Sequence, residues 1–181
     1  MKNILVVSGH TDLEQDSVAN KTILENLKQQ LPDAVFDLLD AQYPDFNIDV
    51  KKEQEKLIKA DIIVFQYPIF WYSMPSLLHR WVEKTFVHGF SHGSKGKSLQ
   101  GKKLIASFTT GAPETFFANG GIDHMLYPIH GICNLCGMEF KGYVYTGGVS
   151  YQLRTDEASL SQIKAKACEH AKRVISLINT I

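Results

Sequence analysis

Short apolar runs rich in β-branched residues alternate along this chain with longer segments of helical periodicity. The runs have the length of buried strands, and they span residues 3–9, 34–40, 61–66, 102–110 and 140–148. Apolar residues spaced three and four apart predict helices over residues 18–31, 51–60, 75–86, 121–137 and 155–178. Strands that alternate with helices pair in parallel through right-handed crossovers. The pattern therefore predicts an α/β fold with one doubly wound parallel sheet, in the order 2-1-3-4-5 or in the Rossmann order.

Residues suited to capping stand before three of the predicted helices. Asp16 or Ser17 is placed to cap the first, Asp49 the second and Thr155 the last. Pro128 falls inside the fourth helix and predicts a bend there.

The composition is that of one globular domain over residues 1–181, with 44% apolar and 21% charged residues. Lys+Arg and Asp+Glu both number 19, so the basic excess of a nucleic-acid-binding surface is missing. The N-terminus does not read as a signal peptide, and no stretch has the apolar length of a membrane span. Three cysteines without a disulfide pattern predict a reducing, cytoplasmic location.

In a doubly wound sheet, ligands bind beyond the carboxyl ends of the strands, so the loops there carry the candidate site. The loop at residues 8–20 contains neither GxGxxG nor GxxxxGK[ST], which argues against a dinucleotide fingerprint and a P-loop. It places His10, Ser17 and Asn20 around the start of a helix, where backbone N–H groups and the helix dipole favour a phosphate. The alternatives are that Ser17 only caps the helix and that His10 is a solvated loop histidine.

The loop after the third strand is unusually aromatic. It carries two prolines that stiffen it, Pro68 and Pro75, and four aromatic residues, Tyr67, Phe70, Trp71 and Tyr72. Flat apolar faces at a ligand-binding edge suit a planar heteroaromatic ligand such as a flavin. The alternatives are a surface for a partner subunit or a core cluster. Trp81 shares a helical face with Leu77 and Leu78 and is predicted to be core.

The loop after the fourth strand, residues 109–121, opens with Thr109, Thr110 and Gly111. Glycine there permits a tight turn and a close backbone approach, which could place hydrogen-bonding groups at the edge of a flat ligand. The simpler interpretation is an ordinary turn.

Cys133 and Cys136 have the spacing of a redox dithiol, but they close an apolar helix instead of opening one, and we expect buried core thiols. Cys168 reads as structural. Only His124 and His130 could add ligands nearby, so no metal site is predicted.

Together these segments resemble the flavodoxin-like NAD(P)H:quinone oxidoreductases. The most specific part is QYPIFWYSMPSLLHRW, from Gln66 to Trp81, and GH…S.AN, YPDF.ID and TTG..E support it. The similarity runs from Lys2 to about Gly148. The branch it resembles most is the ancillary oxidoreductase of glutathione-gated potassium-efflux systems, with the bacterial drug-activity modulators nearby. The resemblance implies a three-layer fold with strand order 2-1-3-4-5.

The resemblance also implies cofactor-binding residues. Those that match the family's phosphate and ribityl contacts are His10, Ser17, Val18, Ala19 and Asn20. Those that match the loop under the flavin ring are Pro68, Ile69, Phe70, Trp71 and Tyr72. Those at the edge of the ring are Thr109, Thr110, Gly111, Ala112 and Phe117.

Two departures from the family pattern stand in the last group. Ala112 takes the place of a second glycine, and its methyl group could shift the turn or tighten the pocket. Phe117 and Asp123 stand at the spacing where mammalian-type enzymes have a tyrosine and a histidine that steady charge on the reduced flavin. That role is absent here or falls elsewhere, for example to His124 or to solvent.

The implied activity is ping-pong transfer of two electrons from NAD(P)H, through bound FMN, to a quinone or similar flat acceptor. FMN is favoured over FAD because the chain is short, and no protein residue is expected to act as a strict catalyst. The family pattern implies a homodimer. One alternative is a regulatory subunit that docks on a potassium-efflux transporter at the inner face of the membrane. Others are a one-electron carrier, which the neutral charge disfavours, and a flavin-free binding module.

Overall fold

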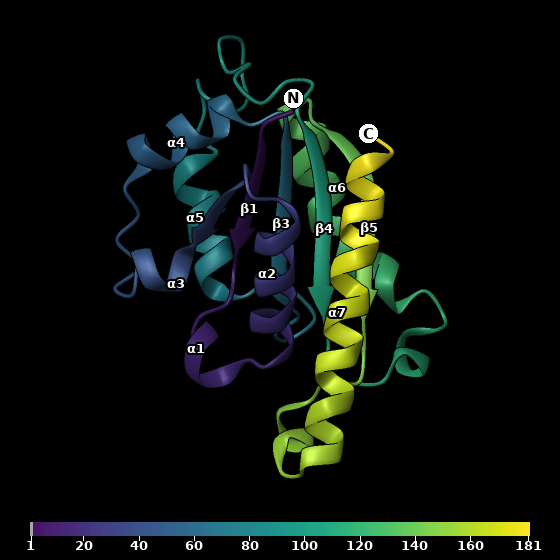
Figure 1. Ribbon diagram of the computed structural model, residues 1–181. Helices are drawn as coiled ribbons and strands as arrows, with labels where there is room; N and C mark the ends of the chain where they lie inside the picture. The colour runs from purple at the N-terminus through teal and green to yellow at the C-terminus, as the bar shows by residue number, and fades with distance from the viewer. Residues whose placement is uncertain (1) are drawn as a thin grey trace.

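The computed structural model describes residues 2–181. Its centre is a five-stranded sheet in the order β2-β1-β3-β4-β5, in which every neighbouring pair is parallel (Figure 1). The strands are β1 (Ile4–Ser8), β2 (Val35–Leu38), β3 (Ile62–Pro68), β4 (Lys103–Thr109) and β5 (Glu139–Thr146). This confirms the order 2-1-3-4-5 and excludes the Rossmann order.

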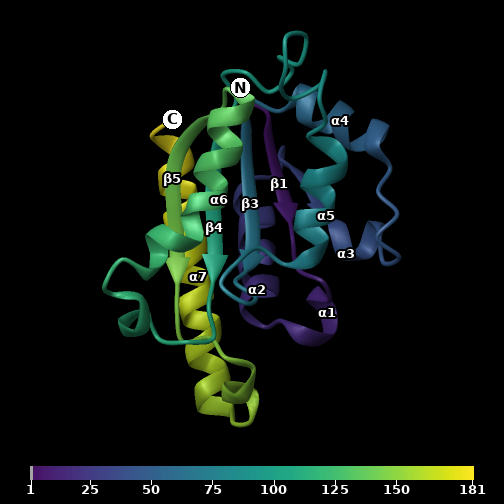
Figure 2. The same cartoon turned by 180° about the vertical axis from the view of Figure 1, so that it is seen from behind.

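Helices cover both faces of the sheet. They are α1 (Leu13–Asp16), α2 (Ala19–Gln30), α3 (Leu39–Gln42), α4 (Val50–Lys59), α5 (Ser76–Thr85), α6 (Gly121–Cys136) and α7 (Glu157–Asn179), with two 3-10 turns, η1 (Glu114–Phe117) and η2 (Tyr151–Arg154). Figure 1 shows α2 and α7 in front of the sheet, and Figure 2 shows α5 and α6 over the opposite face.

The strand side chains divide between two cores, as the period of two in a strand requires. Val6, Val64 and Ile105 pack with α2 and α7. Val7 and Phe65 point the other way, into the larger core that α4, α5 and α6 close. Because both faces are covered, the central strands read as unbroken apolar runs, which is why the sequence reveals them.

The third strand is longer than predicted. β3 extends to Pro68, so Tyr67 is a strand residue at 1% exposure and does not belong to the aromatic loop. Pro68 fits there because β1 ends opposite Gln66, leaving no neighbour on that side to need its missing N–H.

The second predicted strand is shorter, because the chain turns into α3 at Leu39. The capping predictions have mixed outcomes. Asp49 caps α4 by accepting from the N–H of Lys52 at 3.1 Å. The cap of α7 is Asp156, one residue after the predicted Thr155. The N-cap position of α2 is Val18, although the Ser17 hydroxyl accepts from the backbone N–H of Asn20 at 3.0 Å.

The expected burial of Trp81, Cys133 and Cys136 is confirmed. Trp81 is fully buried, and Cys133 and Cys136 are buried thiols. Burial raises the pKa of Cys133 to about 11, which disfavours the reactive thiolate. Over residues 2–181, no cluster of three potential metal ligands occurs. No helix in the described chain combines the length and apolarity that crossing a membrane would require.

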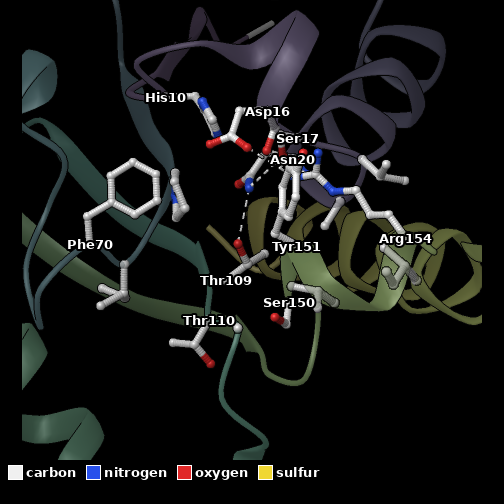
Figure 3. A pocket seen from close by; sticks show the side chains of 17 residues that line it. His10, Asp16, Ser17, Asn20, Phe70, Thr109, Thr110, Ser150, Tyr151 and Arg154 are labelled. Atoms are coloured by element: carbon white, nitrogen blue, oxygen red, sulfur yellow. Dashed lines mark hydrogen bonds and ion pairs between the residues drawn. The ribbon is translucent and has the colours of Figure 1, made fainter. Parts of the chain in front are cut away.

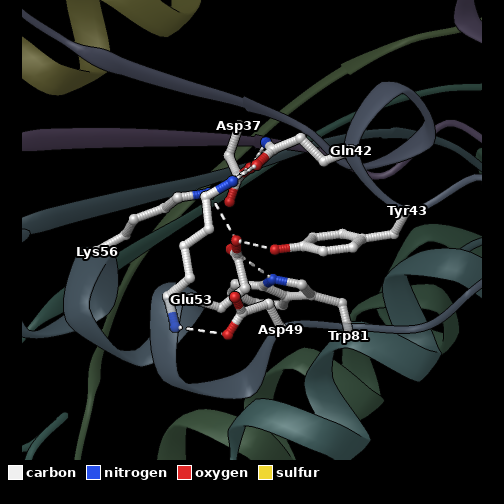
Figure 4. A network of polar contacts seen from close by, with 8 residues as sticks. Asp37, Gln42, Tyr43, Asp49, Glu53, Lys56 and Trp81 are labelled. Atoms are coloured by element: carbon white, nitrogen blue, oxygen red, sulfur yellow. Dashed lines mark hydrogen bonds and ion pairs between the residues drawn. The ribbon is translucent and has the colours of Figure 1, made fainter.

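A buried polar cluster ties the β2 edge to α4 and α5 (Figure 4). The Glu53 carboxylate accepts from the Tyr43 hydroxyl at 2.6 Å, from the Trp81 indole N–H at 2.9 Å and from the Lys56 ammonium at 2.6 Å. Lys56 also donates to Asp37 at 2.8 Å. Two buried carboxylates thus share one ammonium. Burial and contact with Glu53 raise the pKa of Asp37 to about 7.

This raised pKa predicts how stability depends on pH. An unfolded aspartate titrates near pH 4, so between about pH 4 and pH 7 only the folded chain holds this proton. Binding of this proton therefore adds to the free energy of unfolding at low pH, and the added stability is lost as pH rises from about 4 to about 7. Between pH 5 and pH 8, we expect the free energy of unfolding to fall less in Asp37→Asn than in the wild type, by on the order of 2 kcal/mol. Urea unfolding at several pH values checks this. Asp33→Asn, on the exposed surface, is the control. If the free energy of unfolding changes with pH equally in both variants, the raised pKa does not belong to Asp37.

Candidate functional site

Two adjoining hollows open at the carboxyl ends of the strands. The first, the polar hollow, is lined by residues 16–20, 68–70, 109–111 and 149–151, together with His10, Arg154 and Ile163 (Figure 3). The second, the aromatic hollow, is lined by Ile69, Trp71, Tyr72, Thr110, Gly111, Ala112, Phe116 and Phe117. Ile69, Thr110 and Gly111 belong to both, so the two form one elongated site.

The structure brings all the predicted site residues to these two hollows. Those in the polar hollow are His10, Ser17, Val18, Ala19, Asn20, Pro68, Ile69, Phe70, Thr109, Thr110 and Gly111. Trp71, Tyr72, Ala112 and Phe117 line the aromatic hollow. Asp123, which stands at the spacing of a family histidine, is exposed in the first turn of α6 and lines neither. The binding role of the residues in the hollows stays a prediction.

A buried amide organises the polar hollow. The Nδ2 of Asn20 donates to the Ser17 hydroxyl at 3.1 Å and to the Thr109 hydroxyl at 3.1 Å. Its Oδ1 accepts from the Gln66 amide at 2.9 Å. One side chain on α2 therefore joins the loop after β1 to the ends of β3 and β4. The two hydroxyls lie beside the start of α2, where the helix dipole favours an anion.

His10 is buried and is not the solvated loop histidine that the sequence left open. Its Nδ1 accepts from the backbone N–H of Asp12 at 3.0 Å, and its ring lies edge-on to Phe70. Burial lowers the pKa of His10, although Asp16, Asp40 and Asp12 oppose the shift. A neutral ring whose Nδ1 accepts carries its proton on Nε2, so His10 is a donor there.

Sequence reasoning missed the contribution of the segment after β5. The Arg154 guanidinium donates to the backbone carbonyl of Asp16, lies 3.7 Å from the Asp16 carboxylate and stacks 4.3 Å over the Tyr151 ring. It places a positive charge beside the start of α2 (Figure 3). The available signal was positional, because the loop after the fifth strand meets the same sheet edge and Arg154 is its only cation.

The aromatic loop is a tight turn with strained residues at its tip. Trp71 and Tyr72 have φ of 50° and 64°, in the left-handed region that costs a non-glycine residue about 1 kcal/mol. Phe70 and Ser73 close the turn through two backbone hydrogen bonds of 3.0 and 3.1 Å. The turn holds Trp71 at 95% and Tyr72 at 64% exposure. The core-cluster alternative is therefore wrong for these two aromatics, and it holds for Tyr67.

Two hydrogen bonds to one carbonyl hold the turn after β4 in place. The Thr110 hydroxyl donates to the Ala112 carbonyl at 2.8 Å, and the Gly148 N–H donates to the same carbonyl at 2.8 Å. A side chain at Gly147 would meet that carbonyl at 2.9 Å, so glycine is required for the approach. Ala112 itself lines the aromatic hollow.

Backbone donors remain available at both turns. Across residues 2–181, none of the hydrogen bonds formed uses the backbone N–H groups of Trp71, Tyr72, Gly111 or Ala112. All four belong to residues that line the hollows. Backbone donors beside a flat apolar surface suit the carbonyl and nitrogen edge of a heteroaromatic ring.

Comparisons with known proteins agree with this fold. The model of a family described by its flavodoxin-like fold matches residues 2–171. An uncharacterised NAD(P)H oxidoreductase of Bacillus subtilis is 40% identical over 145 residues, which are 77% of this chain and 82% of that protein.

Two solved structures are also similar. General stress protein 14 from Treponema denticola, in complex with FMN, has a TM-score of 0.82 and 26% identity, over 97% of this chain and 99% of that one. A protein from S. violaceusniger described as a tryptophan halogenase has a TM-score of 0.77 and 30% identity, over 92% and 96%. Since these descriptions differ, likeness of fold does not by itself identify a reaction.

The exposure of Trp71 predicts a fluorescence result, because the only other tryptophan, Trp81, is fully buried. For flavin-free monomer, at low protein concentration, we expect iodide to quench a large part of the wild-type emission and very little of the emission of Trp71→Phe. The remaining emission of that variant should also lie at shorter wavelength, as for an indole shielded from water. Trp81→Phe, which keeps only Trp71, is the matched control. Protection of Trp71 in the flavin-free monomer would contradict its exposed position, whereas protection that appears only as the protein concentration rises would show that a second copy covers it.

Proposed function

The chain belongs to the flavodoxin-like NAD(P)H oxidoreductase family, and from that membership we propose that it uses bound FMN to carry two electrons from NAD(P)H to a quinone or similar flat acceptor. The observation that carries the proposal is the elongated site. A polar hollow with a positive end adjoins an exposed aromatic hollow. FMN has the matching parts, which are a phosphate, a polyol chain and a planar ring.

The donor set of the polar hollow fits a phosphate. It combines the Ser17 and Thr109 hydroxyls, the first turn of α2 and the guanidinium of Arg154. Arg154 is now engaged by Asp16, so a phosphate would compete with that carboxylate for the guanidinium. Neutral hydroxyls and one cation suit a bound dianion, because charge-assisted hydrogen bonds are the strong ones.

The aromatic hollow fits the ring. The unused N–H groups of Trp71, Tyr72, Gly111 and Ala112 can donate to its polar edge, and preorganised donors stabilise negative charge that develops there. The flavin, when bound, supplies the electron-transfer chemistry, and the protein orients it. Trp71 and Tyr72 then flank the space for a second flat molecule, first the nicotinamide and afterwards the acceptor.

The proposed reaction requires no side chain in the hollows as a nucleophile or as a general acid. Among residues 2–181, no group of side chains that could hold a metal ion lies there. The chain's own contribution is binding, orientation and exclusion of water from one face. We further propose a homodimer, supported by the exposed Trp71, Tyr72 and Phe116 beside the site. A second copy over this surface would complete the slot. A cytoplasmic location is part of the same proposal.

The first test is the absorbance of the purified protein. We expect flavin absorbance bands that correspond to about one flavin per chain, and heating should release a chromophore that is identified as FMN. Anaerobic addition of NADH or NADPH should bleach these bands. Addition of a benzoquinone should restore the colour. A protein that stays colourless and takes up neither FMN nor FAD would refute the function, whereas bound FMN that NAD(P)H cannot bleach would favour a one-electron carrier.

The second test concerns Arg154. Loss of a hydrogen bond to a charged group costs roughly 1.5–3 kcal/mol. In Arg154→Ala we therefore expect the Kd for FMN to rise by about tenfold or more, while the Kd for riboflavin, which lacks the phosphate, stays near the wild-type value. Fluorescence titration of flavin-free protein measures both. Arg80→Ala, on the exposed face of α5, is the matched control. Equal weakening of both flavins would contradict the assignment of Arg154 to the phosphate.

A further inference from the structure

A continuous chain of buried hydrogen bonds leads from the polar hollow across β3 and β4 to α7 and the end of β5. Beyond Asn20, the Gln66 amide carbonyl accepts from the Ser107 hydroxyl at 2.5 Å. Ser107 lies 2.7 Å from Nε2 of His170, on α7. The other ring nitrogen of His170 lies 2.8 Å from the Thr146 hydroxyl. Gln66, Ser107 and His170 are fully buried, so each of these groups needs its partner.

Such a chain can run in either of two directions, because hydroxyls, amides and imidazole can each donate or accept. In one direction Ser17 and Thr109 accept from Asn20, and their protons are free for the hollow. In the reverse direction both hydroxyls donate to Asn20, and their protons are used internally. The direction therefore decides what the hollow offers to an anion.

Arg173 selects the direction. Its guanidinium, which can only donate, bonds the Thr146 hydroxyl at 2.6 Å. If the Thr146 hydroxyl donates to Nδ1 of His170, then Thr146, both ring nitrogens of His170 and the Ser107 hydroxyl all have hydrogen-bond partners. In the reverse direction, Thr146 would accept from both Arg173 and His170, and its buried proton would have no acceptor within residues 2–181. An unsatisfied buried donor costs about 1–3 kcal/mol.

The selected direction requires a neutral His170 with its proton on Nε2. Burial, together with the nearby charge of Arg173, lowers the pKa of His170 to about 3, so the ring holds a single proton at neutral pH. Nδ1 then accepts from Thr146, and Nε2–H donates to Ser107, which donates to Gln66.

At the end of this hydrogen-bond chain, beside the polar hollow, the Ser17 hydroxyl proton is left without a partner. Its oxygen accepts from the Asn20 backbone N–H at 3.0 Å and from the Asn20 amide at 3.1 Å. Both lone pairs are then used, and only the proton remains. Thr109 accepts from the same amide, and its proton is free as well.

We propose that His170 is a positioning residue, which fixes the direction of this chain so that the Ser17 and Thr109 hydroxyls donate into the polar hollow. The proposal rests on the proposed function for the identity of the ligand, the phosphate end of FMN. It adds a residue that lines neither hollow and acts through Ser107, Gln66 and Asn20.

The test compares FMN with riboflavin on flavin-free protein. In His170→Leu we expect FMN affinity to fall by roughly tenfold, the size of one hydrogen bond to a charged group, with riboflavin affinity changed less than about twofold. His170→Gln, whose amide can still donate to Ser107, should recover most of the loss. In a Ser17→Ala/Thr109→Val background, His170→Leu should have no further effect on the ratio of the two affinities. A purely structural role would not disappear in that background.

Val174→Ala is the matched control, because it opens a cavity on the same buried face of α7 and leaves the hydrogen-bond chain through His170 intact. If His170→Leu does not fold, Ser107→Ala interrupts the chain with a smaller loss of volume. Equal weakening of both flavins, or an effect that persists in the double background, would overturn the proposal.

Nitrogen-15 NMR of the His170 ring tests the direction without any flavin. Protonated Nε2 with bare Nδ1 supports the proposal, and the opposite tautomer overturns it. If the wild type binds neither flavin, the proposed function fails separately, and inorganic phosphate becomes the probe. Phosphate binding that is weaker in His170→Leu would then support the inference, and equal binding or none would overturn it.

Discussion

The pairing of β3 with both β1 and β4 is the constraint on which the site depends. β3 is buried along its whole length, and its last residue, Pro68, lies opposite Thr109 at the end of β4. The first bond beyond the pair, from the Ile69 N–H to the Thr109 carbonyl at 2.8 Å, holds the aromatic loop against the turn after β4. The two hollows share residues because these strand ends are locked together. A slip in this register would separate them and turn buried side chains to the wrong face.

The same strands carry polar side chains through the middle of the sheet. Gln66 and Ser107 are fully buried among apolar neighbours, and burial of an amide or hydroxyl is costly unless it is hydrogen-bonded. Here each finds a partner, and the partners connect α2, β3, β4, β5 and α7. An apolar core would serve stability as well or better. The polar chain gives instead a defined orientation of donors at the ligand-binding edge, which apolar packing cannot supply.

Much of this arrangement could be predicted from the sequence, because it depends on local pattern. Buried parallel strands read as apolar runs, and loops that follow such strands must meet at one edge. What could not be predicted depends on contacts between distant residues. Tyr67 looks like its loop neighbours, and only the extent of pairing with β4 makes it a core residue. Arg154 reaches Asp16 across 138 positions of sequence, and His170 meets Ser107 across 63. Nothing in their local sequence marks them.

In the proposed function, the polar hollow serves tight binding of the cofactor and the aromatic hollow serves turnover. Charge-assisted bonds and buried hydroxyls give the polar hollow the means to hold one end of a ligand firmly. The aromatic hollow is built for access instead, since its tip residues are exposed and the turn that displays them is strained. Strain of this kind persists only where the surrounding structure enforces it, and it concentrates at functional positions. In the proposed function, a cofactor anchored by its phosphate leaves one ring face open for flat molecules that must enter and leave in turn. Affinity for the cofactor can then be high without slowing the release of its reaction partners, because the two depend on different residues.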